Sequence, residues 1–377
     1  MNVRWLEGPD AFRTMEPAWR RLESDLDPPP FLTYDWARLW HRHLAGGATT
    51  PAILVAGDPP RGLLAMVMQR LGSLRLLRPM GHGISDYLGP LADEADPEAW
   101  RALGRGLAET TPSFDVCLLE GLRAAAPARR ALQAASGLPG MEGRREICPA
   151  IDARGSWPAF LAGKTKNFRA GLRRTARRVD AYGTVTLGRE RPSPSLLREL
   201  EQTERASWKW EHGLSFFRDG RLRAFVEDLL LMSEIAAEVW TCRVGGELAA
   251  FDISLLNHRT RYSYQTAYRS ARSGTGTLLL AHVVRATFES GLERLDLMQG
   301  DDAYKRRWAS ETAEVHRMAL ARGARGRALL PLLHLRWRMP RSPRLRQSRV
   351  RIQRWCRNRA GRRHSVESSP RSPEPLP

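Results

Sequence analysis

The feature that most constrains the fold is one order of predicted elements that occurs twice along the 377 residues. In the second half, strand-like runs and helical periods follow each other as β-α-α-β-β-β-α-β-β, starting at residues 183–187. The first half gives β-α-α-β-β-β-α-β, then a further helix and a strand that ends near Asp152. Corresponding elements lie about 180 residues apart, with residue 3 matched by 183, 97 by 275 and 114 by 293. This constant offset predicts a duplicated domain.

Two local signals support the order in the second half. Gly245-Gly246 separates two strand-like runs, residues 239–244 and 247–256, and predicts a tight hairpin turn. Asp219 is placed to cap a helix, because the apolar residues that follow it keep the helical period. The elements are therefore defined by turn and cap chemistry as well as by hydrophobic pattern.

The net charge of +19 is concentrated in the last part of the chain. Between Arg322 and Arg363 there are 15 arginines and no Asp, Glu or Lys, so residues 1–321 carry only +5. A mildly basic body with a very basic tail differs from a basic nucleic-acid-binding domain. Of the 60 basic residues only four are lysines, at positions 164, 166, 209 and 305.

The tail has three open interpretations. Residues 328–337 are apolar, and residues 344–359 predict an Arg-rich helix with Trp355 on its apolar side. Such a helix suits an anionic membrane surface, its charge also suits nucleic acid, and a nonspecific disordered tail is the third interpretation. The final residues are of low complexity and predict disorder.

Residues 164–180 predict a basic helix between the two halves. Apolar residues spaced 4, 4 and 3 apart form one helical stripe: Phe168, Leu172, Ala176 and Val179. The other faces carry seven basic residues and no acid before Asp180: Lys164, Lys166, Arg169, Arg173, Arg174, Arg177 and Arg178. They form either a solvated helix surface or a basic wall that faces an anionic substrate or a coenzyme phosphate. For the second interpretation the substrate-binding candidates are Lys164, Lys166, Arg169 and Arg173.

A glycine loop joins the third strand of the hairpin to the next helix, at residues 268–277. The repeated element order resembles that of the GNAT acyltransferase fold, in which the same loop holds a coenzyme pyrophosphate. Amides and the helix dipole at a helix start favour such a negative charge. The family's usual loop has Gln or Arg, two residues, Gly, one residue, then Gly or Ala. Gly274 and Gly276 match this spacing, whereas the first position is Ala271 and Arg272 falls one residue late.

The loop is thus either a coenzyme site or a plain helix start. For a coenzyme site, the resemblance implies these cofactor-binding candidates: Tyr268, Arg272, Gly274, Thr275, Gly276 and Thr277.

The run DLMQGDDAYKRRW, residues 296–308, resembles a more specific signature, D-x-x-x-G-x-x-x-Y-K-x-x-W. This is the signature of the CelD/BcsL-like acetyltransferases, a GNAT branch related to the FemABX aminoacyltransferases and associated with bacterial exopolysaccharide and cellulose biosynthesis. The matching residues are Asp296, Gly300, Tyr304, Lys305 and Trp308. Further similar segments cover the chain from about residue 3 to 320: 31–40, 85–87, 164–178, 207–209, 215–217 and 270–279.

Four residues are candidates for catalysis. Tyr304 either donates a proton to a leaving thiolate or binds the substrate, and Lys305 either holds an anionic group or clamps the loop. Asp252 lies within an apolar strand, where an unpaired charge is costly, so it is either paired or functional. Asp296 is the second candidate for the general base. Further substrate-binding candidates are Trp208, Tyr264, Asp86 and Tyr87, and the signature's Trp308 is expected to pack.

The expected fold class is α/β, of α+β type: tandem duplicated GNAT-like domains whose mixed, mostly antiparallel sheets are flanked by helices, plus a basic C-terminal tail. The expected boundaries are 1–155, 156–322 and 323–377, the last partly helical and then disordered. No apolar run reaches the length of a membrane span, and the N-terminus shows no secretory pattern, so a cytoplasmic protein is expected, with peripheral contact at the inner membrane face as an option.

The resemblance implies an acyltransferase that uses acetyl-CoA or another acyl-CoA as co-substrate. The acceptor is then an amine or hydroxyl on a sugar or lipid-linked sugar. Two alternatives remain: FemABX-like aminoacyl transfer from charged tRNA, in which nucleic acid becomes a partner, and a degenerate, membrane-docked scaffold of a polysaccharide synthase. The four cysteines show no metal-binding spacing, so no metal is expected.

Overall fold

The computed structural model describes residues 1–47, 49–109, 112–123 and 125–338. Apart from one added short strand, β5, the strands and helices of the first half follow the predicted order: β1 (Val3–Glu7), α1 (Asp10–Leu26), α2 (Tyr34–Leu44), β2 (Thr49–Gly57), β3 (Pro60–Leu71), β4 (Leu74–Pro79), β5 (Leu91–Ala92), α3 (Pro97–Ala108), β6 (Val116–Leu122), α4 (Ala126–Ser136) and β7 (Gly140–Asp152).

The second half begins with α5 and α6 and then follows the order predicted for it, with two short helices added within that order. Its elements are α5 (Trp157–Gly163), α6 (Lys166–Asp180), β8 (Val185–Glu190), α7 (Pro194–Arg205), α8 (Trp208–Glu211), α9 (Gly220–Leu231), β9 (Ala237–Val244), β10 (Glu247–Leu256), β11 (Thr260–Tyr268), α10 (Thr275–Glu289), β12 (Arg294–Asp296), α11 (Ala303–Trp308), β13 (Glu311–Ala321) and α12 (Gly323–Arg338).

Both local signals of the sequence are confirmed. Asp219 is the N-cap of α9, and its carboxylate accepts hydrogen bonds from the amides of Arg221 and Leu222. Gly245 and Gly246 connect β9 to β10 with φ angles of 59° and 84°. Two successive positive φ angles define the tight hairpin turn that follows the right-handed twist of the strands, and glycine adopts them without steric cost.

The α/β class and the mostly antiparallel pairing are as predicted, but the strands of the two halves form one continuous sheet. Its order is β1-β2-β3-β4-β6-β13-β7-β12-β11-β10-β9-β8, and β5 pairs with β3. Strand β13, from the end of the second half, lies between β6 and β7 of the first half. Strand β7 in turn continues into the second half, where its last residues pair with β12. Each half therefore receives a strand of the other.

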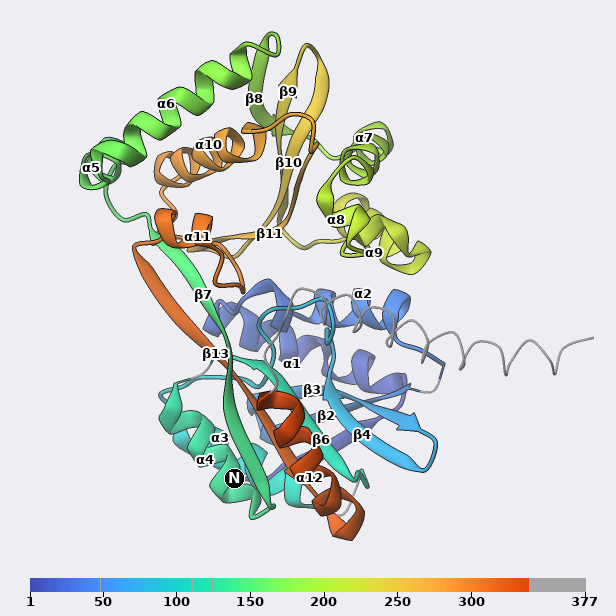
Figure 1. Cartoon of the computed structure of the whole chain (residues 1–377). Helices are drawn as coiled ribbons and strands as arrows, with labels where there is room; N and C mark the ends of the chain where they lie inside the picture. Colours follow the sequence, from blue (N-terminus) through green and yellow to red (C-terminus); the bar gives the residue numbers. More distant parts are fainter. Residues whose placement is uncertain (48, 110–111, 124, 339–377) are drawn as a thin grey trace, which may run out of the picture.

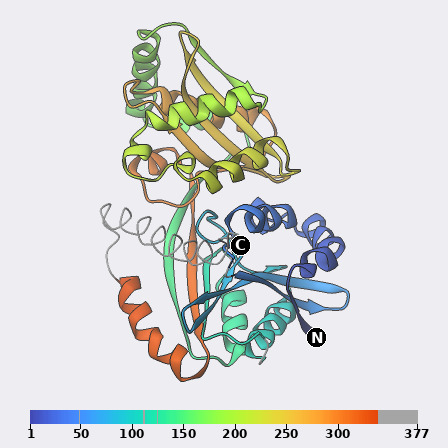
Figure 2. The same ribbon diagram turned by 90° about the vertical axis from the view of Figure 1, so that its right-hand side faces the viewer.

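Figures 1 and 2 show the result as two lobes, which the long strands β7 and β13 connect. One hydrophobic core lies in each lobe, and a third core contains residues of both, among them Trp36 of α2, Phe225 of α9 and Tyr262 of β11. At the same contact, the ring atom Nε2 of His43 in α2 lies 2.7 Å from the carboxylate atom Oδ2 of Asp228 in α9. The two lobes are thus packed against each other as well as joined by the sheet.

The sheet opens at the point where β11 and β12 meet. These parallel strands pair only from Thr260 to Tyr262, after which the chain beyond Asp296 turns away toward β7. The later residues of β11 up to Tyr268 keep β10 on one side only. This open edge, next to the start of α10, leaves space for a site.

The C-terminal region begins with α12, which packs beside β7 and β13 (Figure 1). The helix predicted at residues 344–359 and the predicted disordered end lie outside the described residues. In the described part of the chain, no helix combines the length and the apolar character needed to cross a bilayer.

Candidate active site

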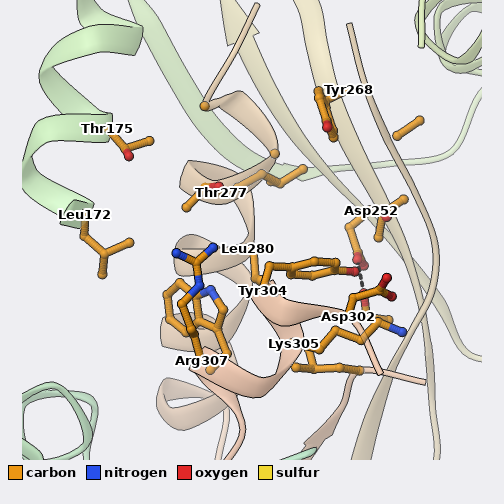
Figure 3. Close-up of a pocket in the computed structure, with 18 of the residues that line it drawn as sticks. Leu172, Thr175, Asp252, Tyr268, Thr277, Leu280, Asp302, Tyr304, Lys305 and Arg307 are labelled. Atoms are coloured by element: carbon orange, nitrogen blue, oxygen red, sulfur yellow. Dashed lines mark hydrogen bonds between the residues drawn. The ribbon is translucent and has the colours of Figure 1, made fainter. Parts of the chain in front are cut away.

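A cavity of about 1150 Å³ lies along the open edge of β11. Its walls come from α6, the start of α10, the chain around α8, and the signature segment that contains α11 (Figure 3). The first half of the chain contributes Asp86, from the loop between β4 and β5. The cavity therefore brings the glycine loop, the basic helix and the signature together in one place.

The glycine loop forms one end of the cavity. Gly274 is the N-cap of α10 with a φ angle of 101°, and a Cβ atom there would lie 3.1 Å from Thr175 and 3.3 Å from Val179 of α6. A Cβ atom on Gly276 would lie 2.9 Å from the ring of Tyr268. The two glycines thus allow α10 to begin close against α6 and β11, with its first-turn amides, which have no intrahelical acceptor, at the cavity.

The cofactor-binding candidates divide into two groups. Four of them line the cavity: Tyr268, Gly274, Gly276 and Thr277. The other two do not. Thr275 is buried, and its hydroxyl donates to the carbonyl of Arg272 at 2.8 Å. The Arg272 guanidinium lies 5.5 Å from the centre of the Tyr182 ring and 3.8 Å from Glu247.

Of the four substrate-binding candidates in the basic segment, only Lys164 lines the cavity. Lys164 lines the cavity, but its ammonium donates to the carbonyls of Arg307, Trp308 and Ala309. The Arg169 guanidinium is held by carbonyls at the end of α5, and neither it nor Lys166 or Arg173 lines the cavity. The residues of this helix that do so with charged side chains are Lys164, Arg174 and Arg178.

Asp252 lies in β10 within the middle of the cavity wall. Its carboxylate accepts hydrogen bonds from Ser254, at 2.5 Å, and from Ser263 of β11. Burial raises the pKa of this carboxyl above its ordinary value, and the two hydroxyl donors partly offset that rise. Asp252 is therefore both paired and open to the cavity, and a carboxylate whose pKa is raised is a stronger proton acceptor than an ordinary one.

Asp296 is placed differently from Asp252. It is 0% exposed and does not line the cavity. Its carboxylate accepts from the Tyr87 hydroxyl at 2.7 Å and from the Met298 amide at 2.8 Å. Tyr87 does not line the cavity either, so this pair joins the two lobes behind the site and has no direct contact with a substrate.

The signature loop after Asp296 is held from two sides. The Gln299 amide donates to the Asp86 carboxylate at 3.0 Å, and the Gln299 side chain donates to the Asp86 carbonyl. The Lys305 ammonium donates to the carbonyls of Gln299, at 2.7 Å, and Met298, at 3.2 Å. Burial lowers the pKa of Lys305 and raises that of Asp86. Lys305 thus clamps the loop, and it also lines the cavity.

Tyr304 projects into the cavity, with its hydroxyl directed toward the carboxylate of Asp252 (Figure 3). Desolvation of its hydroxyl within the cavity, together with the charges of Asp302 and Asp252, raises the pKa of Tyr304. The protonated phenol is a hydrogen-bond donor at this point. Trp308, one turn further, packs on Phe168 with ring centres 4.9 Å apart, as expected for a packing residue.

Exposed aromatic rings gather at this cavity. Among the described residues, the three large aromatic side chains with the greatest exposure are Tyr304 at 43%, Trp208 at 40% and Tyr268 at 37%, and all three line it. Tyr264 also lines it, although burial holds its pKa well above the ordinary value and its hydroxyl donates to the Ile84 carbonyl at 3.2 Å. The flat apolar faces of these rings suit contact with the apolar parts of a bound ligand.

Sequence reasoning missed Lys209, whose ammonium lines the cavity near Asp252. It donates to the Gln265 side-chain oxygen at 3.3 Å, and the Gln265 amide in turn donates to the buried Glu204. Glu204 also accepts from the Ser215 hydroxyl. Burial lowers the pKa of Lys209. The rarity of lysine was the available signal, since three of the four lysines line this cavity.

The first half does not repeat the basic end of the site. At the corresponding helix start, α3 is capped by the side chain of Asp96, which accepts from the Ala99 amide at 3.2 Å. The preceding loop contains Asp93 and Glu94 in addition. A carboxylate already occupies the anion-binding position of this helix, so the first half supports the site through Asp86 and Tyr87 instead.

Comparisons with known proteins agree with this geometry. Residues 166–306 match the family model described as an acetyltransferase (GNAT) domain. The second half of the chain is therefore a GNAT acetyltransferase domain, and the protein is an acyltransferase. None of the curated proteins matches the chain in sequence.

Solved structures similar to this chain include FemX, with a TM-score of 0.62 and 11% identity over 88% of this chain and 99% of that one. The L-PGS of Bacillus licheniformis has a TM-score of 0.55 and 15% identity, over 85% and 95% of the two chains. The C-terminal domain of a putative lysylphosphatidylglycerol synthetase from Agrobacterium fabrum has a TM-score of 0.53 and 15% identity, over 86% and 97%. At these identities the likeness concerns the fold, which extends over both lobes.

Proposed function

We propose that the protein transfers an acyl group from an acyl-CoA to an amine or hydroxyl of a sugar or lipid-linked sugar, in the synthesis of exopolysaccharide or another part of the cell envelope. The observation that carries this proposal is the single cavity that joins the start of α10 to Asp252 and Tyr304. One end offers amides and basic side chains to a coenzyme, and the other offers an acid–base pair. The envelope context comes from the resemblance of residues 296–308 to the CelD/BcsL-like signature.

Two residues each carry out one proton transfer, one from the acceptor and one to the leaving group. Asp252 accepts the proton of the acceptor's amine or hydroxyl while the nucleophile attacks the thioester carbonyl carbon. The tetrahedral intermediate then collapses, the carbon–sulfur bond breaks, and Tyr304 donates its proton to the leaving thiolate. The products are the acylated acceptor and free coenzyme A. Lys305, with Asp86, holds the loop that carries Tyr304 in place.

Isothermal titration calorimetry with acetyl-CoA tests the donor. We expect saturable binding by the wild-type protein and its loss in Gly276→Val, because a side chain there collides with Tyr268 and fills the end of the cavity. Gly188→Val is a suitable control, since nothing lies within 4 Å of a Cβ atom at that position of β8. Absence of binding by acetyl-CoA and by longer acyl-CoAs would contradict the proposal.

Aminoacyl transfer from charged tRNA is a second candidate, because the fold matches FemX over both lobes. The names of the other two similar proteins denote a lipid with a lysyl group, which is also an aminoacyl product. A transfer assay with a mixed pool of charged tRNAs, run beside one with acetyl-CoA, separates the two candidates. Transfer from tRNA alone would favour the second.

A further inference from the structure

The glycine loop lacks the basic residue that usually opens it. Ala271 stands at that position, and Arg272, one residue later, turns away to Tyr182 and Glu247. The loop therefore offers amides but no cation to the phosphates of a coenzyme. A charged donor at this end of the cavity has to find its counter-charge elsewhere.

Helix α6 carries two arginines beside this loop. Arg174 and Arg178 are one turn apart and both line the cavity. The residues that lie next to them on α6, Thr175 and Val179, are those that meet Gly274 at the start of α10. Direct helix packing thus holds the part of α6 that carries the two arginines beside the glycine loop.

No acid in the described part of the chain neutralises this pair. Within the described residues, the ion pairs and hydrogen bonds of the structure include none to the guanidinium of Arg174 or Arg178. Arg307 of α11 reaches the same region, with its guanidinium directed along α10 toward Leu280 (Figure 3). This end of the cavity therefore holds three guanidinium groups, those of Arg174, Arg178 and Arg307, that have no ion-pair partner among the described residues.

We propose that Arg174 and Arg178 bind the phosphates of the acyl-CoA donor and supply the charge that the glycine loop lacks. The inference rests on the proposed function. Guanidinium groups donate two parallel hydrogen bonds to phosphate oxygens, and two of them one helical turn apart match a pyrophosphate or a neighbouring ribose phosphate. If α6 only presents a solvated surface, replacing any two of its arginines should have the same effect on coenzyme binding.

The helix provides a matched control for that difference. Arg173 and Arg177 are exposed, do not line the cavity and have the same spacing, so the double change of Arg173 and Arg177 to Gln removes the same net charge. Calorimetry with coenzyme A compares three full-length proteins: wild type, R174Q/R178Q and R173Q/R177Q. Thermal melts verify that both variants fold.

We expect R174Q/R178Q to raise the Kd for coenzyme A about tenfold or more, because charge-assisted hydrogen bonds are lost, and R173Q/R177Q to change it by less than about twofold. Dephospho-coenzyme A and pantetheine, measured in parallel, identify the phosphate that the pair binds. If R174Q/R178Q binds coenzyme A no more tightly than dephospho-coenzyme A, the pair binds the ribose phosphate. If R174Q/R178Q loses affinity for both compounds by the same factor, the pair binds the pyrophosphate. Pantetheine itself should bind all three proteins equally.

The two proposals fail in different ways. If both double variants bind coenzyme A as the wild type does, or lose affinity equally, the assignment of Arg174 and Arg178 is wrong while the acyl-CoA function stands. If the wild-type protein binds no coenzyme A, the proposed donor is wrong, and the assignment falls with it.

Discussion

The hydrogen bond from Tyr87 to Asp296 offers a test of whether the first lobe supports the site. In Tyr87→Phe the ring stays, so its packing against Phe31 and Tyr262 is retained and no cavity forms. The change removes one donor, at 2.7 Å, from a carboxylate that is fully buried. Hydrogen bonds to charged groups contribute about 1.5–3 kcal/mol, so we expect the free energy of unfolding to fall by about 2 kcal/mol.

Tyr264→Phe is the matched control, because it also removes a hydroxyl that links the two lobes. Its bond is longer, at 3.2 Å, and ends on the neutral carbonyl of Ile84. A neutral bond of this kind contributes about 1 kcal/mol or less. Urea unfolding, followed by tryptophan fluorescence, measures both variants, and acyl-transfer kinetics provide a second readout.

Tyr87→Phe should also lower kcat, since Asp296 begins the loop that leads to Tyr304, while the Kd for the donor should stay near its wild-type value. The reasoning would be refuted if Tyr87→Phe unfolded like the wild type, or if it lost no more stability than Tyr264→Phe. In either case the buried carboxylate does not depend on the first lobe.

Three further outcomes are expected. Asp252→Asn should lower kcat by about 10²–10⁴-fold, the usual contribution of a general base, with donor binding by calorimetry unchanged. Because burial raises the pKa of Asp252, and a base acts only after losing its proton, kcat/KM should rise with pH above the ordinary carboxyl range near 4, and this rise should vanish in Asp252→Asn. Lys305→Met should lower kcat and increase proteolysis of the signature loop, whereas Arg325→Met, at an exposed position of α12, should do neither.

The order of elements could be predicted because its determinants are local. Asp219 caps α9 with its own side chain, and Gly245-Gly246 forms its turn within four residues, so both act wherever the segment lies. The exchange of β7 and β13 could not be predicted in this way. In the sequence, each of these two strands is the last strand of its half. Which strand each one pairs with depends on sheet edges that are formed by segments distant in sequence.

The same distinction applies to the site. The glycine loop and the signature are continuous motifs, and Gly274, Gly276, Tyr304 and Lys305 all lie at the cavity. The arginines of α6 that line the cavity could not be predicted, because the apolar stripe shows which side of the helix packs, but not which of its two basic flanks meets α10.

The position of Lys209 at the cavity could not be predicted, for a related reason. The residues that hold it, Gln265 and Glu204, come from β11 and α7, and only the fold brings them to the end of α8.

The exchanged strands also determine when the protein can finish folding. Until residues 311–321 have left the ribosome, β6 has no neighbour on one side, although the rest of its lobe is already synthesised. Such an unpaired edge is a site where chains associate wrongly. The loop that carries Tyr304 comes directly before β13, so this loop is anchored at its C-terminal end only when β13 enters the sheet. The site therefore depends on one of the last described segments to be synthesised, which lies between two strands of the first half.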